Sequence, residues 1–565
     1  MKAPKAPKAP KAPKAPKAPK APKAPKAPKP TKLSRKFSRL IKQAEKADWD
    51  EVAKTLEGLL EKHKDELTYI QLVAGAKWML DSGHWILCYK LGYEALLREP
   101  ERPEAPEVLF FLFLHRNETE RAEDCLTLVR NYGGDKPQYL IWEILLMNDQ
   151  GNNFGVLKMY DEGRIPFEKE DPRLSEIVFS VMMALITANR VAEAREMVDK
   201  YYPEVTDENP NIINLHAKIN QAEENFAESV KYFEMNETIR KGEQVGIEAR
   251  WNKALMQLQY GDLENGWENY EVRWDWERFP TRKFDFSSPK WAGESLAGKS
   301  ILLWGEQGIG DEVLFLTLLP NLLELGPSKV GIFVSKKLCP VIERWYPGAL
   351  VYPFGEGEEV DQDKDFDYHL PVGSLPIRLG NPDISGPKHF IKERPETVAL
   401  REKLLAEHPG KTRIVGLSWR SGVLTHRRIQ YYLSHHAVAD ILAEAPDDVL
   451  FVSLQYSLME EEKEGLASEP NLYIPDEEFF DDLASQLNYI QACDLVVTSG
   501  SICLALSGIT AQPCITWGPK RVWTLLGGDK YPWFPLVHMI KCEPNWDLGA
   551  LVTSINKLLK IFYSR

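Results

Sequence analysis

The chain from residue 301 to residue 320 reads Ile301-Leu-Leu-Trp304-Gly-Glu-Gln-Gly308-Ile-Gly310-Asp311-Glu-Val-Leu-Phe315-Leu-Thr-Leu-Leu-Pro320. A short apolar run, typical of a buried strand, leads into a glycine-rich turn that ends in an acid. Apolar residues at helical spacing follow, so the stretch predicts a strand, a tight loop and a helix. Glycines let a ligand approach the backbone, and the first turn of a helix offers unpaired N–H groups. We expect a ligand site here, with Asp311 placed to accept a proton; the alternative is an ordinary turn in which Asp311 caps the helix.

The remainder of the chain alternates between short apolar runs and amphipathic segments, which favours parallel, doubly wound sheets. A stretch rich in proline and charge, residues 381–394, separates two such halves. We therefore expect a lobe at 281–395 and a second lobe at 396–565 that ends in a helix, with a ligand between them at the carboxyl ends of the strands. Predicted strands cover residues 300–303, 330–334, 349–352, 368–370, 413–418, 449–453, 472–474, 495–498 and 513–516, and one of the predicted helices covers 312–324.

Polar residues follow three of the strands predicted in the second half. Arg420 comes directly after one of them, and a guanidinium there can bind phosphate oxygens with two parallel hydrogen bonds. Gln455 follows another strand, and the hydroxyls of residues 498–501 precede a predicted helix, which is a suitable cradle for a diphosphate. Each residue alone has an ordinary explanation as a helix cap or a solvated side chain. Together, three polar strand ends at one edge of one sheet favour a nucleotide site.

Residues 33–280 contain a degenerate repeat. Short polar turns lie just before Trp49, Trp85, Thr119, Phe154, Val191, Phe226 and Leu263, at spacings of 36, 34, 35, 37, 35 and 37 residues. This period matches a helix–turn–helix unit of tetratricopeptide length, and the unit from Trp251 to Tyr270 resembles the tetratricopeptide consensus most clearly. Stacked helix pairs form a solenoid whose concave face can hold a polypeptide, or they can serve a purely structural role.

The amino-terminal segment differs from everything that follows it. Lys-Ala-Pro repeats run from Lys2 to Pro28, and a proline at every third position forbids helix and sheet. We expect residues 1–32 to be a disordered arm that either solubilises the protein or binds a polyanion such as nucleic acid. The first 36 residues hold twelve Lys and one Arg without an acid; since the whole chain carries a formal charge of −13, the remainder carries −26. An acidic body argues against nucleic-acid binding through the folded domains.

Two further patterns in the sequence suggest an ATP site and a metal site. Residues 293–300 match the Gly-x-x-x-x-Gly-Lys-Ser spelling of a phosphate-binding loop, but a predicted loop precedes them and a strand follows, which is the wrong context for ATP. The acids Asp361, Asp363 and Asp365 suggest a metal-binding pair, which we interpret instead as a solvated loop.

Seven widely spaced cysteines without a C-x-x-C pair fit a reducing compartment. No apolar run has the length of a membrane span and the amino terminus lacks an apolar leader, so we expect a cytoplasmic protein.

The order of these motifs resembles bacterial proteins that join tetratricopeptide repeats to a GT-B glycosyltransferase unit related to the lipopolysaccharide heptosyltransferases. More distantly, it is similar to O-GlcNAc transferase. The resemblance covers about residue 243 to the carboxyl terminus. It rests on the segments 296–311, 367–376, 415–419, 453–455, 481–482, 493–496 and 531–535.

The resemblance implies an inverting, metal-independent transfer of a sugar from a nucleotide-sugar co-substrate to an acceptor hydroxyl, with no cofactor. Asp311 stands at the position of the general base. Relatives often carry Asp-Thr and then a His where this chain has Gly500, Ser501 and Ala505, so the chain departs from the family pattern at these positions. His369 and Asp482 become candidate ribose or acceptor contacts. Donor and phosphate contacts are expected from Gly308, Gly310, Trp419, Arg420, Ser421, Gln455, Thr498, Ser499, Gly500 and Ser501.

The sequence, with this resemblance, thus predicts a glycosyltransferase built from helical repeats and a two-lobed α/β unit, and a protein held by the repeats is the candidate acceptor. The alternative is a non-catalytic scaffold with the same fold, in which the repeats bind partners and the nucleotide-sugar pocket is degenerate.

The first testable prediction concerns the arm. Deleting residues 2–29 should leave the melting temperature unchanged, because a chain of lysine, alanine and proline buries no apolar surface. Its loss should instead abolish a salt-sensitive association with a polyanion, since binding by about ten like charges depends steeply on ionic strength. Thermal unfolding and titration with a polyanion at several salt concentrations measure both effects. A melting temperature several degrees lower in the truncated protein would show that the arm packs on the body.

Overall fold

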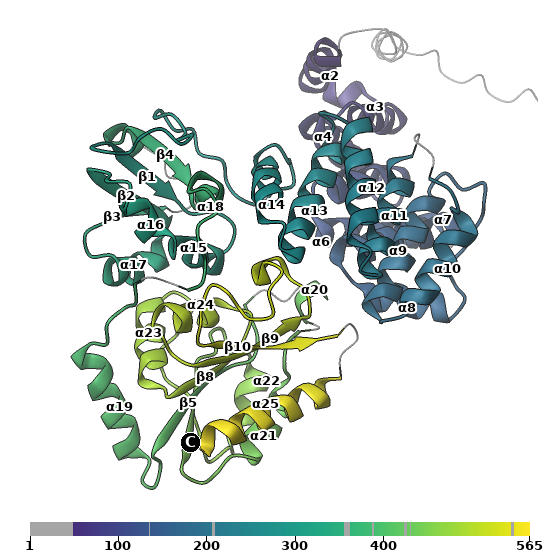
Figure 1. Ribbon diagram of the computed structural model, residues 1–565. Helices are drawn as coiled ribbons and strands as arrows, with labels where there is room; N and C mark the ends of the chain where they lie inside the picture. Colours follow the sequence, from purple (N-terminus) through teal and green to yellow (C-terminus); the bar gives the residue numbers. More distant parts are fainter. Residues whose placement is uncertain are drawn as a thin grey trace, which may run out of the picture. The chain divides into compact units, whose positions relative to one another are not determined.

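The computed structural model describes residues 49–134, 136–205, 209–354, 362–386, 389–422, 426–429, 431–543 and 547–564. The predictions for the Lys-Ala-Pro arm and for Asp361 lie outside these residues. The chain divides into two compact units, residues 1–134 and 135–565, which are described separately (Figure 1). Among the described residues, no helix combines the length and the apolar character needed to cross a bilayer.

The described part of the first unit is helical. Adjacent helices pack in pairs, α3 with α4 and α5 with α6. Buried residues such as Leu72, Leu91 and Leu109 lie between the helices. Where α4 packs against α5, a Cβ on Gly92 would lie 2.8 Å from the Leu109 side chain, so a larger residue would displace it. The elements are α2 (Trp49–His63), η1 (Lys64–Glu66), α3 (Tyr69–Asp81), α4 (Trp85–Arg98), α5 (Glu104–His115) and α6 (Thr119–Gly133).

The second unit begins with further helix pairs of the same kind. Helices α11 and α12 form one close pair, and α13 and α14 form the last one before the sheets. The elements are α7 (Pro137–Gln150), α8 (Asn153–Asp161), α9 (Leu174–Thr187), α10 (Val191–Tyr201), α11 (Pro210–Ala222), α12 (Phe226–Ile239), α13 (Gln244–Tyr260), α14 (Leu263–Tyr270) and η2 (Glu271–Trp274).

One turn geometry recurs at the predicted turn positions and explains the repeat. A residue with positive φ ends the first helix of the pair, and the second helix begins two residues later. The residue between them donates its backbone N–H to the carbonyl five positions earlier, as in the bond of 2.8 Å from Glu118 to Phe113. Glycine and asparagine tolerate this left-handed conformation. The residues with positive φ are Gly83, Asn117, Gly151, Asn189, Glu224 and Gly261.

The first sheet follows the helices and has the strand order β3-β2-β1-β4, with all strands parallel. Ile301 and Leu303 of β1 face a core shared with α15 and α17, whereas Leu302 and Trp304 face aromatic residues on the other side. The elements are β1 (Ser300–Trp304), α15 (Ile309–Leu316), α16 (Leu319–Leu323), β2 (Lys329–Ser335), η3 (Lys336–Leu338), α17 (Cys339–Trp345), β3 (Leu350–Phe354), η4 (Gln362–Asp365), β4 (Tyr368–Pro371), η5 (Val372–Ser374) and α18 (Leu375–Arg378).

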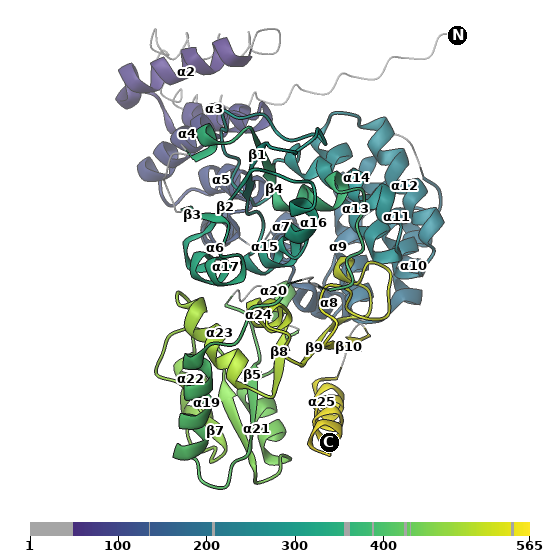
Figure 2. The same cartoon turned by 60° about the vertical axis from the view of Figure 1, so that its left-hand side comes forward.

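The second sheet is also parallel throughout, with the order β10-β9-β8-β5-β6-β7. Alternate residues of β5 face opposite cores: Ile414 packs in the core with α23 and α24, and Val415 in the core with α21 and α25. These two pairs of helices cover opposite faces of the sheet (Figures 1 and 2). The elements are α19 (Pro395–Glu407), β5 (Arg413–Ser418), α20 (His426–Ile429), α21 (His435–Ala443), β6 (Val449–Ser453), α22 (Glu460–Leu466), β7 (Leu472–Tyr473), α23 (Leu483–Ala492), β8 (Leu495–Ser499), α24 (Ile502–Ile509), β9 (Cys514–Pro519), η6 (Trp523–Leu525), β10 (Val537–Cys542) and α25 (Leu548–Tyr563).

The last helix pair, α13 and α14, packs against both of the lobes that contain the sheets. Trp267 of α14 contacts Phe315 of α15 and Trp523 of η6 through edge-to-face rings 6.1 and 6.2 Å apart. Gly527 reaches the turn between α13 and α14 so closely that a Cβ on it would lie 2.5 Å from the Gly261 nitrogen. The predicted order of helical repeats followed by two α/β lobes with parallel sheets is confirmed, although in the first lobe the described helices α15 to α17 pack on one face of the sheet and aromatic side chains cover the other.

Two local predictions differ from the structure. The helix predicted at 312–324 is divided into α15 and α16, because Pro320 lacks the N–H that a continuous helix needs. Strand β10, which carries the exposed His538, was not predicted; among the described residues it is an edge strand that pairs with β9. An edge strand with polar residues lacks the continuous apolar run by which the other strands were recognised.

Candidate active site

The glycine-rich loop connects β1 to α15 and places Asp311 in the first turn of the helix. The Gly308 N–H donates to the Asp311 carboxylate over 3.1 Å, and Gly308 begins the backbone hydrogen bonds of α15. Gly305 lies where a Cβ would approach the Glu312 carboxylate to 2.4 Å, so a larger residue would displace that side chain. The predicted strand, loop and helix are confirmed at this position.

Asp311 has an unusual protonation equilibrium. Partial burial raises the pKa of its carboxyl to about 6, although the Gly308 N–H and the positive charge of Arg428 oppose the rise and the Glu306 charge adds to it. A carboxylate with a pKa near neutrality is a stronger base than an exposed one and is still ionised at pH 7. This carboxylate is suited to accept a proton from a bound hydroxyl.

The next residue is also an acid and faces the protein interior. Glu312 is 2% exposed, and one of its carboxylate oxygens has no hydrogen-bond partner. Burial raises the pKa of Glu312 to about 8, and the neighbouring charges of Asp311 and Glu306 contribute to the rise. Glu312 is therefore mostly neutral at pH 7, and Asp311 carries the negative charge that faces the cavity.

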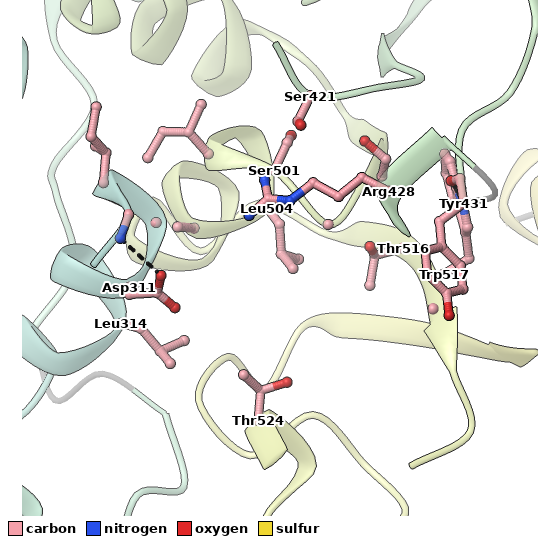
Figure 3. Close-up of a pocket in the computed structure, with 18 of the residues that line it drawn as sticks. Asp311, Leu314, Ser421, Arg428, Tyr431, Ser501, Leu504, Thr516, Trp517 and Thr524 are labelled. Carbon is pink, nitrogen blue, oxygen red and sulfur yellow. Dashed lines mark hydrogen bonds between the residues drawn. The ribbon is translucent and has the colours of Figure 1, made fainter. Parts of the chain in front are cut away.

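A cavity of about 550 Å³ opens beside Asp311 and is lined by residues of both lobes (Figure 3). This volume lies in the usual range for small-molecule sites. On the second lobe its wall contains Ser499, Gly500 and Ser501, where β8 ends and α24 begins. The hydroxyls of Ser499 and of Thr516 are buried and have no hydrogen-bond partner in the protein. Buried hydroxyls normally find a partner, so these two favour a polar ligand in the cavity.

Positive charge and aromatic rings complete the wall. Arg428 of α20 extends into the cavity toward the side on which Ser501 lies (Figure 3). Lys337 lies at the wall with its ammonium 3.6 Å from the centre of the Phe480 ring, and it donates to the Phe480 carbonyl over 3.1 Å. The aromatic lining residues are Tyr431, Tyr432, Tyr456, Phe479, Phe480, Trp517, Tyr531 and Phe534. This combination of hydroxyls, helix N–H groups, cations and rings is suited to a phosphorylated ligand that also has a flat or apolar part.

About half of the residues expected at the site line this cavity. From the first lobe these are Gly308, Gly310 and Asp311. From the second lobe they are Ser421, Ser499, Gly500 and Ser501. The structure thus brings together the two strand ends that were most informative in the sequence, those of β1 and β8.

Arg420 does not line the cavity. It is 4% exposed, and its guanidinium forms a bidentate pair with Glu462 of α22, with 2.7 Å from Nε to the carboxylate. The Trp419 indole donates to the same carboxylate over 2.8 Å. Gln455 accepts the backbone N–H groups of Trp419 and Arg420, each over 3.1 Å. Through these hydrogen bonds Arg420, Trp419 and Gln455 hold the loop after β5 in place. The arginine that lines the cavity is Arg428 instead.

Three other expected contacts also lie apart from the cavity lining. His369 stacks on Phe286 with ring centres 4.3 Å apart and accepts the Trp304 indole N–H over 3.1 Å, while burial lowers its pKa to about 4. Asp482 is the N-cap of α23, where it accepts the Ser485 N–H over 2.9 Å. Thr498 is buried, and its hydroxyl contacts Ser501 over 3.2 Å, so it supports the wall from behind.

The two alternative motifs have structural roles in the described residues. Lys299 pairs with Asp367 over 3.1 Å and Ser300 begins β1, so the segment resembling a phosphate-binding loop leads into a strand and not into a helix. Asp363 is buried and accepts hydrogen bonds from Ser287 and Ser288 over 2.9 and 2.7 Å. It is therefore a structural residue and not part of a solvated loop.

Sequence reasoning missed Arg428, Lys337 and most of the aromatic wall. Arg428 lies in the four-residue helix α20, and Lys337 in the 3-10 turn η3. Neither element has an apolar period that would draw attention to it. Tyr456, which directly follows Gln455 after β6, was the accessible signal, because it shares the strand-end position that marked its neighbours.

Comparisons with known proteins give distant relationships. No profile of a known protein family matches the chain. Protein FlbA of Caulobacter vibrioides is 30% identical over 324 residues, which are 54% of this chain and 54% of FlbA, so the chain spans about half the length of this curated relative.

Similar solved structures include three proteins whose names describe sugar transfer. The ADP-heptose lipopolysaccharide heptosyltransferase II of E. coli is 12% identical, covers 47% of this chain and 99% of its own, and has a TM-score of 0.35. A family 9 glycosyl transferase of Veillonella parvula is 12% identical, covers 46% and 91%, and has a TM-score of 0.34. The O-GlcNAc transferase of Thermobaculum terrenum is 10% identical, covers 87% and 92%, and has a TM-score of 0.26.

The second testable prediction follows from the pairing of Arg420. Arg420→Ala should lower the free energy of unfolding by about 3–5 kcal/mol, because it leaves the Glu462 carboxylate buried without its partner. Replacing both residues together, Arg420→Met with Glu462→Met, should recover part of that loss, because it removes the unpaired charge although the Trp419 indole N–H loses its acceptor. Denaturant unfolding measures both. Equal destabilisation by the single and the double variant would show that the loss comes from packing and not from an unpaired charge.

Proposed function

We propose that the protein is a glycosyltransferase that moves a sugar from a nucleotide-sugar donor to an acceptor hydroxyl with inversion at the anomeric carbon. The observation that carries the proposal is the arrangement of one cavity: Asp311, with its raised pKa, lies on one lobe, and the start of α24 lies on the other together with Arg428. A base and an anion site in one cavity are the two parts that such a transfer requires.

In the proposed reaction, the acceptor hydroxyl binds beside Asp311 and the donor diphosphate binds at Ser499–Ser501. The acceptor oxygen attacks the anomeric carbon as Asp311 removes its proton, and the bond from that carbon to the diphosphate breaks on the opposite face. The N–H groups at the start of α24, the Ser501 hydroxyl and the Arg428 guanidinium stabilise the negative charge that the diphosphate gains. These groups make the proposal one of metal-independent transfer without a cofactor.

The helix pairs support a proposal for the acceptor. The sequence resemblance to tetratricopeptide repeats joined to a transferase unit suggests that the acceptor hydroxyl belongs to a polypeptide that the repeats hold. The same resemblance supports a nucleotide sugar as the other partner. A peptide-binding role for the repeats and sugar transfer at the cavity are separable, since the two regions use different residues.

A second candidate, a non-catalytic binding protein, is favoured by one observation. Gly500, Ser501 and Ala505 line the cavity, whereas the family resemblance implies Asp-Thr and a His at these positions. Binding of nucleotides without turnover would support this candidate. A non-catalytic binding protein would show no turnover either with Asp311 or with a substitution of Asp311.

The third prediction tests the function directly. Nucleoside diphosphates and the corresponding nucleotide sugars, supplied as a panel, should raise the melting temperature, because a ligand that binds only the folded state stabilises it. Release of nucleoside diphosphate from the nucleotide sugar that gives the largest shift then reports hydrolysis or transfer. A panel in which no compound shifts the melting temperature at millimolar concentration would contradict the proposal.

The fourth prediction concerns Asp311. Asp311→Asn should reduce turnover on the order of 10²–10⁴-fold, because it removes the general base, while the affinity for nucleoside diphosphate stays close to that of the wild type. Asp547→Asn is a matched control, since Asp547 caps α25 through Gly549 and asparagine caps helices equally well. Wild-type turnover in Asp311→Asn would exclude Asp311 as the base.

The pH dependence gives an independent check on the same residue. Below pH 6 the turnover should fall about tenfold per pH unit as Asp311 becomes protonated, and above about pH 7 it should be constant. Because the folded-state pKa lies above the ordinary value of 3.8, the stability that Asp311 contributes is complete at low pH and is lost as the pH rises through 6. Asp311→Asn should therefore have a higher melting temperature than the wild type at pH 8 but not at pH 4.

A further inference from the structure

Arg273, in the 3-10 turn that ends the last helix pair, is buried and fully hydrogen bonded. It has no exposed surface, and all five of its N–H groups find acceptors. Two bonds of 2.7 Å go to the two carboxylate oxygens of Glu306. The others go to the Tyr270 carbonyl over 3.0 Å, to Glu271 over 2.8 Å and to the Ser374 hydroxyl over 3.1 Å.

Its main partner belongs to the loop that carries the proposed base. Glu306 is 1% exposed and lies five positions before Asp311, between β1 and α15. Apart from Arg273, its carboxylate accepts the Gly373 N–H over 2.8 Å, after β4. Glu306 thus joins the last helix pair to the ends of β1 and β4. A Cβ on Gly373 would lie 2.5 Å from the Glu306 carboxylate, which shows how closely this carboxylate is enclosed.

A second set of contacts acts on the neighbouring residue. Gln307 has a φ of 64°, in the left-handed region that a residue with a side chain adopts only when its surroundings hold it there. Its backbone N–H donates to the Thr281 hydroxyl over 2.8 Å, and its side-chain amide donates to the Tyr270 hydroxyl. The conformation of the loop is therefore fixed from the helical side at two consecutive residues.

We infer that Arg273 is a positioning residue for the proposed transfer: through Glu306 it fixes the loop from Gly305 to Gly310 and thereby the place of the Asp311 carboxylate. The inference rests on the proposed function. It also moves the functional boundary, because the transferase unit then includes the last helix pair from Gln244 onward and does not begin at residue 281. A polypeptide that displaced this helix pair would change the geometry of the base without touching the cavity.

The charges around Asp311 give the inference an electrostatic consequence. The ionisable groups that influence the pKa of Asp311, or whose own pKa it influences, are Arg428, Glu306, Glu312, Tyr270 and Tyr531. Of these, Glu306 is the group that Arg273 holds, and its charge raises the pKa of Asp311. Neutralising Glu306 should therefore lower the pKa of Asp311.

The experiment compares Arg273→Met, Glu306→Gln and the double variant in the full chain, with Arg195→Met as the matched control. Arg195 of α10 forms a bidentate pair with Glu223 at 2.8 and 2.5 Å; these side chains are about a quarter exposed, whereas those of Arg273 and Glu306 are fully buried, so the control reports the loss of a bidentate pair outside the loop. Arg273→Met should reduce kcat about 10²-fold with little change in the affinity for nucleoside diphosphate, because a base displaced by about 1 Å costs about that much. Since Arg273 acts through Glu306, adding Arg273→Met to Glu306→Gln should cause little further loss. Should Arg273→Met fail to fold, Arg273→Lys replaces it.

Two readouts do not depend on turnover and separate this inference from the proposed function. Hydrogen exchange of the backbone amides at 305–311 should accelerate in Arg273→Met and Glu306→Gln but not in Arg195→Met. In Glu306→Gln, the difference in stability between proteins with Asp311 and with Asp311→Asn should stop growing at a lower pH than in the wild-type background, because the folded-state pKa of Asp311 is lower. Unchanged exchange and an unchanged Asp311 titration would overturn the inference. A wild type without turnover on any donor, combined with the expected exchange and titration, would contradict the proposed function alone.

Discussion

The buried ion pair between Arg273 and Glu306 is the interaction on which the geometry of the candidate site depends. A buried carboxylate is tolerated only when its hydrogen bonds are satisfied, and here the guanidinium and the Gly373 N–H satisfy them. Because one partner comes from the helix pairs and the other from the glycine-rich loop, the two regions cannot shift independently without leaving a charge unpaired. Within this pair, the Arg273 guanidinium also compensates the negative charge of Glu306, which precedes Asp311 by five positions in the loop. Structure and electrostatics of the site therefore have a common origin.

The parallel sheets explain why sequence patterns located the site as well as they did. Carboxyl ends of parallel strands meet at one edge, so polar residues after β1 and β8 converge although about 190 positions separate them in the chain. Residues on the loop backbone, such as Gly310 and Gly500, line the cavity as expected because their position follows from the topology alone. The direction of a long side chain does not. Arg420 follows β5 as expected, yet it extends to Glu462 on α22, and no pattern in the sequence pairs residues 42 positions apart.

The helix pairs show the same division between local and distant information. The turns could be located from the sequence because a residue in the left-handed conformation is most often glycine or asparagine, as at Gly83 and Asn189. What the last turn does could not be inferred in that way. Gly261 approaches Gly527, and Trp267 approaches Trp523, only because the second lobe folds back against α13 and α14. A boundary drawn at residue 281 from composition thus separates residues that the structure joins.

The pair of adjacent acids at the start of α15 illustrates how environment assigns different roles to similar groups. Successive helical residues point about 100° apart, so Asp311 faces the cavity and Glu312 faces the space below Gly305. Deeper burial raises the pKa of Glu312 to about 8, against about 6 for Asp311. At pH 7 the helix therefore begins with one neutral acid and one carboxylate, and the unpaired N–H groups of its first turn favour that single negative charge. Two carboxylates in contact would each suppress the ionisation of the other; keeping Glu312 protonated leaves Asp311 free to act as a base at neutral pH.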